Sequence, residues 1–497
     1  MAASRPKTSR HIEVERKFDV LDSTVSPSFD GLSAVARVQR SPAQQLEAVY
    51  FDTPGHDLAA HRVTLRRRTG GTDAGWHLKL PAGPDTRTEV RAPLDDGVGG
   101  AVPEALTDVV AAIVRDRPLG PVARISTHRT VDVLYNPDDS PIAEFSDDKV
   151  TASAGDGEPQ QWREWELELS ESASTSTDLL DRLANRLLDA GAEPAGHGSK
   201  LARVLAGSAD DEAETDTQRD PIHRAVAEQV DQLIEWDRAV RADVYDSVHQ
   251  MRVTTRKIRS LLQSSEGVFG ISDDAWVLDE LRQLAAVLGV ARDAEVLAER
   301  YEKALAELPE DLVRGAVDKR LVDGANRRYK SGLRRSLIAM RSERYFRLLD
   351  ALEGLVASEP PSPTGDDDGP ATASIDSAYK RVRKAAKNAS GAADDDRDEA
   401  LHRIRKGAKR LRYTAAATGE AKVSDRAKDI QSLLGDHQDS VVSRTHLSQQ
   451  AEAAHAAGED TFTYGLLYAQ EDELARKARD QLDSALKKLD KSVRKAR

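Results

Sequence analysis

The 497-residue sequence contains no cysteine, which excludes disulfide bonds, thiolate metal sites and a cysteine nucleophile. It has no apolar run near the roughly 18 residues that a membrane helix needs, and its N-terminus lacks the apolar core of a secretory signal. It also lacks an excess of positive charge, because the formal net charge is −13. Any polyanion site must therefore be a local patch. We expect a cytoplasmic protein with no membrane contact and no specific nucleic-acid partner.

The chain is too long for one compact core, so more than one domain is expected. Residues 11–207 read as short alternating strands separated by Gly, Pro and Asp turns. The strands are expected near 11–20, 46–53, 62–69, 75–80, 86–92, 126–135, 141–149 and 161–170, with helices near 103–115 and 177–190. Eight short strands are typical of an antiparallel barrel or sandwich.

From residue 221 onward the apolar period becomes helical. Residues 208–220 are acidic and nearly without large apolar side chains, so we interpret them as a linker, and residues 1–10 as a disordered tail. A stretch rich in Pro, Gly and Asp divides the helical half into two parts, about 221–358 and 372–497. The predicted fold class is α+β: an eight-stranded antiparallel β-barrel followed by an all-α domain of two duplicated helical bundles.

Several predicted strands carry charged side chains on one face and apolar side chains on the other. Because strand side chains alternate, Glu13, Glu15 and Lys17 share one face. The same rule groups the following residues on charged faces of other strands: Arg66 with Arg68, Lys79, Arg87 with Glu89, Glu144 with Asp148, and Glu164 with Glu166 and Glu168. A solvated sheet face explains one such strand, but it does not explain arginines gathered on one strand and glutamates on others. An ionic barrel interior indicates a ligand, since unpaired buried charge is unfavourable.

These residue types suit a metal-bound phosphate compound. Carboxylate oxygens favour hard cations such as Mg²⁺ or Mn²⁺, while arginine and lysine bind phosphate groups. The reaction that such parts favour is phosphoryl transfer, in which stabilisation of charge on the phosphate oxygens supplies most of the catalysis. The sequence has no Ser–His–Asp or Cys–His arrangement and no glycine-rich phosphate loop that would favour another chemistry.

Taken in chain order, the motifs of residues 11–205 resemble those of the CYTH family, the triphosphate tunnel metalloenzymes. The motifs are Glu-x-Glu-x-Lys at 13–17, Tyr50-Phe-Asp-Thr53, Leu65-Arg-Arg-Arg68, Leu78-Lys-Leu80, Arg129, Glu144 with Asp148, Glu166-Leu-Glu168 and Ser199-Lys-Leu201. The resemblance implies a tunnel that hydrolyses inorganic triphosphate or a related short polyphosphate with Mg²⁺ or Mn²⁺.

The same resemblance implies a role for individual residues of the tunnel. Metal would be held by Glu13, Glu15, Asp148, Glu166 and Glu168. Triphosphate binding and catalysis would fall to Lys17, Arg66, Arg68, Lys79, Arg129 and Lys200. Asp147 remains an alternative to Asp148, and Arg87 and Glu89 are further candidates for the tunnel wall.

The helical half contains an internal repeat. The segment His249–Arg259 matches His402–Arg412 at an offset of 153 residues, and Leu284–Asp293 matches Ile430–Asp439 at an offset of 146. Two copies in the same order indicate duplicated helical units.

Each copy of the first segment carries a basic stripe. In a helix, His249, Arg252, Arg256 and Arg259 fall within an arc of roughly 80°, and His402, Arg405, Lys409 and Arg412 repeat this geometry. Apolar side chains point to another side, suited to a bundle core: Met251, Ile258 and Leu262 in the first copy and Ile404 and Leu411 in the second. The stripes lack interleaved aromatic residues, so they fit an extended phosphate chain better than single-stranded nucleic acid.

These paired segments resemble the CHAD family over about residues 221–497. The resemblance implies two four-helix bundles that bind long-chain inorganic polyphosphate through the eight stripe residues, with Lys257 and Arg410 at the edge. Two alternatives stay open. One is a non-catalytic polyphosphate-binding protein attached to polyphosphate granules, and the other is adenylate cyclase activity on ATP, which some CYTH members have.

Overall fold

The computed structural model describes residues 8–155, 157–206, 221–264, 269, 275–357, 375–417 and 419–496. The chain divides into two compact units, Met1–Ile258 with Leu337–Ala357 and Arg259–Ser336 with Ser358–Arg497. The predicted linker and residues 1–7 of the predicted tail lie outside the described residues. Ser9 and Arg10, which the tail was expected to include, already belong to the first strand.

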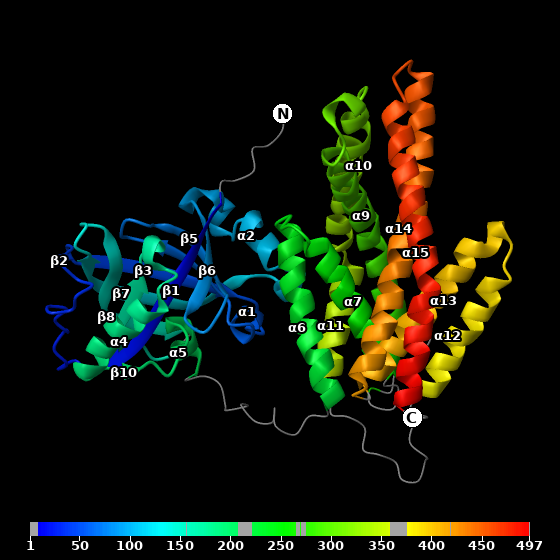
Figure 1. The fold of residues 1–497 in the computed structure, drawn as a ribbon. Coiled ribbons are helices and arrows are strands. Elements are labelled where there is room, and N and C mark those ends of the chain that lie inside the picture. Colours follow the sequence, from blue (N-terminus) through cyan, green and yellow to red (C-terminus); the bar gives the residue numbers. More distant parts are fainter. Residues whose placement is uncertain are drawn as a thin grey trace, which may run out of the picture. The chain divides into compact units, whose positions relative to one another are not determined.

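A closed antiparallel barrel forms the core of the first unit (Figure 1). Its eight strands are β1 (Ser9–Val20), β3 (Gln44–Asp52), β4 (Thr64–Thr69), β5 (Gly75–Pro81), β6 (Thr86–Ala92), β7 (Gly120–Tyr135), β8 (Pro141–Ala154) and β9 (Gln160–Leu169). They follow the order β1-β6-β5-β4-β3-β7-β8-β9, and β9 pairs back with β1 to close the barrel. Two short strands are added at the margins: β2 (Arg37–Arg40) pairs with β7, and β10 (Glu193–Pro194) pairs with β1.

All eight predicted strands are present, which confirms the barrel. The largest difference in bounds is at β7, which begins at Gly120 instead of near residue 126. The early part of β7 pairs with β3 as far as Asp52, across a register shift at Tyr50 and Phe51. Sequence alternation does not reveal such a shift, because it moves the apolar pattern onto the other face.

The apolar core of this unit lies outside the barrel wall. Helix α4 (Thr177–Asp189) covers β1, β8 and β9. The cluster beneath it includes Phe18, Phe145, Trp165 and Leu167 from the strands and Leu180, Leu183 and Leu187 from the helix. Because alternate strand residues point outward into this cluster, the charged residues between them point into the barrel.

The remaining helices of the first unit are α1 (Asp57–Ala60), α2 (Glu104–Val109), α3 (Ala111–Val114), α5 (Lys200–Ala206), α6 (Pro221–Arg241), the greater part of α7 (Ser247–Ser264) and α11 (Glu343–Ala357). Short 3₁₀ turns lie at Leu94–Asp96, Val98–Gly100, Glu171–Ala173 and, in the second unit, Glu310–Leu312. Helix α5 packs Leu201 and Val204 against Tyr50 and Ile125 of the barrel, and this contact brings Lys200 to the barrel interior.

The second unit is helical, as predicted. It contains α9 (Trp276–Ala306), α10 (Val317–Ala339), α12 (Ile375–Ser390), α13 (Asp394–Ala417), α14 (Ala421–Ala456) and α15 (Phe462–Lys495), with the last residues of α10 assigned to the first unit. The residues predicted to face the bundle core are buried in both copies: Met251, Ile258, Leu262, Ile404 and Leu411. None of the helices in the described part of the chain combines the length and hydropathy of a membrane-spanning segment.

Candidate active site

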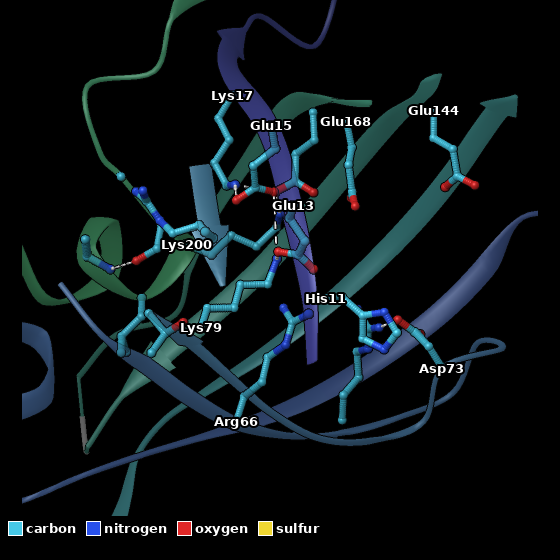
Figure 2. A pocket seen from close by; sticks show the side chains of 18 of the residues that line it. His11, Glu13, Glu15, Lys17, Arg66, Asp73, Lys79, Glu144, Glu168 and Lys200 are labelled. Atoms are coloured by element: carbon cyan, nitrogen blue, oxygen red, sulfur yellow. Dashed lines mark hydrogen bonds and ion pairs between the residues drawn. The ribbon is translucent and has the colours of Figure 1, made fainter. Parts of the chain in front are cut away.

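A cavity of about 840 Å³ lies in the barrel and is lined by its inward-facing residues. Figure 2 shows Glu13, Glu15 and Lys17 projecting from one strand, with Lys79 and Arg66 reaching toward them. The predicted site residues on its lining are Glu13, Glu15, Lys17, Arg66, Arg68, Lys79, Arg129, Glu166, Glu168 and Lys200. Asp148 lies behind this surface, where it contacts Arg129 and Lys200. The residues that strand alternation placed on the charged faces of separate strands therefore lie around one cavity in the folded barrel.

Three carboxylates form a row across neighbouring strands of this cavity. Glu15 of β1 is directly opposite Glu168 of β9, and Glu168 is directly opposite Glu144 of β8. Like charges in such positions destabilise a sheet. Among the described residues, no lysine or arginine lies within ion-pair distance of Glu168. Within the row, Glu168 is therefore short of positive charge, whereas Glu15 pairs with Lys17.

The protonation of Glu168 reflects this shortage. Burial raises the pKa of Glu168 to about 7; Lys79 opposes the rise, and the nearby carboxylates of Glu13 and Glu15 add to it. Around neutral pH the carboxyl group thus stands near its titration midpoint, unlike an ordinary surface glutamate.

Two of the three lysines of the predicted set, Lys17 and Lys79, bind Glu13 and Glu15. Lys79 Nζ lies 2.6 Å from Glu13 Oε2 and 3.8 Å from Glu15 Oε2, and Lys17 Nζ lies 2.5 Å from Glu15 Oε1. Burial would raise the pKa of Glu15, but the charges of Lys17 and Lys79 outweigh it and lower this pKa to about 2. Glu15 is consequently ionised throughout the physiological range.

A second carboxylate group consists of Asp148, Glu164 and Glu166, whose oxygens lie within 4.8 Å of one another and could hold a metal ion. The negative charge of this group is already paired with the side chains of Lys200 and Arg129. Lys200 Nζ lies 2.9, 2.6 and 2.8 Å from these three carboxylates in that order, and Arg129 donates two parallel hydrogen bonds of 2.7 and 2.6 Å to Asp148. Glu164 was not in the predicted set, although the same-face rule that selected Glu166 applies to it equally.

The two adjacent aspartates of β8 point to opposite sides of the wall. Asp147 accepts hydrogen bonds from Arg163 at 2.8 and 2.7 Å and from Ser26 Oγ at 3.0 Å. Asp148 is fully buried and pairs with Arg129 and Lys200. Of the two candidates left open by the sequence, the one joined to the cavity residues is Asp148.

Arg66 is a partly buried cation that makes no ion pair with a carboxylate among the described residues. Its Nη1 donates a hydrogen bond of 3.3 Å to the Tyr50 hydroxyl, and its Nε has no partner in the described part of the chain. The neighbouring Arg68 pairs with Asp73 of the β4–β5 turn, and burial, with the charges of Arg66 and Arg129, lowers the pKa of Arg68 to about 9. Arg66 thus makes no ion pair with a carboxylate of the described residues, so it is the cation best placed to receive an external anion.

The basic stripes of the helical half lie on α7 and α13. The second stripe contacts a neighbouring helix. A Cβ atom at Gly435 would lie 3.3 Å from Arg405 Nη2, and Arg412 Nη1 donates a hydrogen bond of 3.3 Å to Gln431. Both contacts are made to the repeated segment Ile430–Asp439, so this stripe packs partly against α14 instead of projecting wholly into solvent.

Comparison with known proteins accounts for both halves of the chain. A model of the CYTH domain matches residues 11–189, and a model of the CHAD domain matches residues 224–448. The chain belongs to the proteins that join a CYTH domain to a CHAD domain. This confirms both resemblances drawn from the motifs, and it makes the barrel a CYTH tunnel, a domain of enzymes that act on triphosphate compounds and depend on metal.

Two curated relatives come from Mycobacterium tuberculosis. They are "Uncharacterized protein Rv2226" of strain ATCC 25618 / H37Rv and "Uncharacterized protein MT2285" of strain CDC 1551 / Oshkosh, each 65% identical over 515 residues and covering 100% of both chains. The CYTH–CHAD arrangement is therefore matched along its whole length.

Solved structures resemble one part of the chain each. PptA from Streptomyces chartreusis is 19% identical, with a TM-score of 0.44, and the match covers 54% of this chain and 98% of that one. The CHAD domain from the plant Ricinus communis is 24% identical, with a TM-score of 0.40, over 53% and 90%. The putative adenylyl cyclase HpAC1 from Hippeastrum, whose description reports a dominant triphosphatase activity, is 19% identical, with a TM-score of 0.27, over 39% and 95%.

Proposed function

We propose that the CYTH tunnel hydrolyses phosphoanhydride bonds of inorganic triphosphate or a related short polyphosphate with Mg²⁺ or Mn²⁺, and that the CHAD half binds longer polyphosphate. The observation that carries the first part is the carboxylate row Glu15–Glu168–Glu144 in the same cavity as Arg66. A cation would offset the negative charge of this row, and an anion would offset the positive charge of an arginine that has no ion-paired carboxylate. A metal–phosphate complex supplies both at once.

The carboxylates present fit a hard divalent cation. Glu13, Glu15 and Glu168 offer only oxygen donors, and all three line the cavity. We assign the metal to these three, with Glu166 and Asp148 as the further predicted ligands. When bound, the ion would place positive charge on the phosphate oxygens and make a bound water more acidic.

The cations of the tunnel would bind and orient the substrate. Arg66 can grip a phosphate group with two parallel hydrogen bonds, and Lys79 adds charge beside the carboxylates it now pairs with. Arg68 would exchange Asp73 for a phosphate oxygen, and Lys17, Arg129 and Lys200 would stabilise the negative charge that grows on the phosphate oxygens in the transition state.

Phosphate release tests the proposal directly. We expect the purified chain to release phosphate from tripolyphosphate with Mg²⁺ or Mn²⁺, and faster than from ATP or thiamine triphosphate. Binding of tripolyphosphate without release would instead support a non-catalytic binding protein. Formation of cyclic AMP from ATP as the main product would support a cyclase.

The two aspartates of β8 provide a matched pair of variants. Asp148→Asn should lower turnover of tripolyphosphate by about a hundredfold or more, because it removes a charge that holds Arg129 and Lys200 in place. Asp147→Asn makes the same chemical change outside the tunnel, so it should lose stability from the Arg163 pair while keeping turnover within about threefold. Steady-state kinetics and thermal melting of both variants check this, and an equal loss of turnover in the two would refute the assignment.

Metal binding should release a proton from Glu168. Below pH 7 this carboxyl group is mainly protonated in the metal-free tunnel, because its pKa is about 7, and a metal ligand must be ionised. Affinity for Mn²⁺ alone should therefore rise about tenfold per pH unit up to pH 7 and then level off. Conversely, the contribution of Glu168 to folding stability is present below its unfolded pKa and is lost as the pH rises through 7.

Calorimetry with Mn²⁺ at pH 6, in buffers of different ionisation enthalpy, measures the released proton. Glu168→Gln should abolish the release and flatten the pH dependence of the affinity. The same proton release in wild type and variant would contradict a role for Glu168 as a ligand.

A further inference from the structure

One buried histidine of the tunnel is not explained by metal or phosphate binding. His77 lies two residues before Lys79 on β5, so both side chains face the interior. Both His77 and Glu89 of the neighbouring strand β6 are about 1% exposed. His77 Nδ1 lies 2.9 Å from Glu89 Oε1, and Nε2 lies 2.9 Å from the carbonyl oxygen of Asp73.

The stronger of these two contacts is the one with Glu89. Burial lowers the pKa of His77 to about 4, and Arg66 and Arg68 add to this effect while the contact with Glu89 partly opposes it. Burial would raise the pKa of Glu89, but the hydrogen bond from His77 and the charge of Lys79 hold it well below its usual value. The imidazole therefore carries one hydrogen near neutral pH, and a carboxylate attracts that hydrogen more strongly than a carbonyl does.

Glu89 also binds an arginine at the cavity wall. Its Oε2 accepts a hydrogen bond from Arg91 Nε, and Arg91 Nη2 lies 3.7 Å from Glu13 Oε1. Arg91 lines the cavity, and its Nη1 has no hydrogen-bond partner among the described residues. One edge of the guanidinium is thus held against Glu89, while the other is available beside a carboxylate that we assign to the metal.

The turn between β4 and β5 packs closely against β3 just before it reaches this chain of contacts. Gly70 and Gly71 have φ angles of +79° and +73°, and a Cβ atom at Gly70 would lie 2.1 Å from the carbonyl oxygen of Gln45. The turn also sets Asp73 at the cavity, where its carboxylate pairs with Arg68 and its carbonyl faces His77. His77 therefore sits between Glu89 and the Asp73 carbonyl, with a contact at each ring nitrogen.

We propose that His77 is a positioning residue of the tunnel: it holds Glu89, and Glu89 holds Arg91 where the guanidinium contacts a phosphate group of the bound substrate. This inference rests on the proposed triphosphatase function and adds Arg91 to its substrate-binding residues. The alternation rule selects Glu89 and His77 as inward residues, but it does not reveal that they are connected to each other and to Arg91.

Two amide substitutions at position 77 separate the two contacts of the ring. The amide of His77→Asn lies where Nδ1 lies and can still donate to Glu89. The amide of His77→Gln reaches the place of Nε2 and can donate only to Asp73. We expect His77→Gln to raise KM and the dissociation constant for tripolyphosphate about tenfold with kcat within about threefold, and His77→Asn to recover most of that affinity.

Arg91→Gln is the companion variant. It should weaken tripolyphosphate binding by a similar factor, and the double variant His77→Gln/Arg91→Gln should bind no more weakly than Arg91→Gln alone, because both changes remove the same contact. Independent, multiplying effects would overturn the proposal, as would equal affinities of His77→Asn and His77→Gln. If His77→Gln does not fold, unchanged binding by Arg91→Gln still refutes it.

Calorimetric binding of tripolyphosphate without metal keeps this test apart from the proposed function. A wild-type chain that neither binds nor hydrolyses tripolyphosphate rejects the function itself. A wild-type chain that binds it with the same affinity as Arg91→Gln rejects only the positioning role. Thermal melting of each variant verifies that a change in affinity does not come from unfolding.

Discussion

Replacing Glu13 with glutamine is expected to lower kcat for tripolyphosphate by about a thousandfold, which corresponds to about 4 kcal/mol of transition-state stabilisation. Glutamine keeps the shape of the side chain but removes the charge that pairs with Lys79 at 2.6 Å and that we assign to the metal. Stability should hardly fall, because Glu13 and its neighbour Glu15 repel each other and burial already raises the pKa of Glu13. Steady-state phosphate release and thermal melting measure the two quantities.

Glu47→Gln is the matched control for this variant. Glu47 is an exposed residue of β3 that accepts hydrogen bonds from Gln45 at 3.0 Å and Ser126 at 2.8 Å, away from the cavity. The same loss of charge there should leave turnover within about twofold. Polyphosphate capture by the helical half should be unchanged in both variants. If Glu13→Gln kept more than a tenth of the wild-type turnover, Glu13 would not be a metal ligand.

Much of the tunnel could be predicted from the sequence, because strand alternation is a local property. Glu13, Glu15 and Lys17 share a face whatever the neighbouring strands do, and the same holds for Arg66 with Arg68. What alternation cannot supply is which residues stand opposite each other. The pairing of Glu15 with Glu168 depends on the register of β1 against β9, two strands that meet only when the barrel closes.

The site residues that the sequence pattern did not reveal also depend on contacts between separate parts of the chain. Asp73 lies in a turn, where the two-residue period is interrupted, so no pattern points to its pairing with Arg68. Tyr50 was recognised only as part of a motif, although its hydroxyl contacts Arg66 in the folded barrel. The shared face with Glu144 favoured Asp148 over Asp147, but it did not reveal that Arg163 pairs with Asp147 outside the wall and Arg129 with Asp148 inside it.

In the helical half, the spacing of cations and apolar residues was sufficient to place the core. Ile258 and Leu411 are fully buried, as their helical phase predicts. The packing of Arg405 over Gly435 was not predictable from either segment alone. It follows from the contact between α13 and α14, and it gives Gly435 a physical reason, since a larger residue there would press on the guanidinium.

Reversing one charge in each stripe should remove polyphosphate binding. The double variant Arg256→Glu/Lys409→Glu is expected to bind long-chain polyphosphate at least a hundredfold more weakly, because two attractive contacts become repulsive and each like-charge contact costs several kcal/mol. Titration of labelled polyphosphate at several salt concentrations measures this. By analogy with nucleic acids, the wild-type salt slope estimates how many phosphates are neutralised, and the variant should show a smaller slope.

Lys257→Glu/Arg410→Glu is the control that the repeat itself provides. These residues also stand 153 apart, and each follows its partner in the first variant by one position. One position turns the side chain by about 100° around the helix, from the centre of the stripe to its edge. The net charge changes by the same amount in both variants, so a general electrostatic effect would weaken binding equally. A loss of less than about tenfold in the control would locate binding on the stripe, and equal losses would refute the stripe as the site, while tripolyphosphate turnover by the tunnel should stay at the wild-type rate in both.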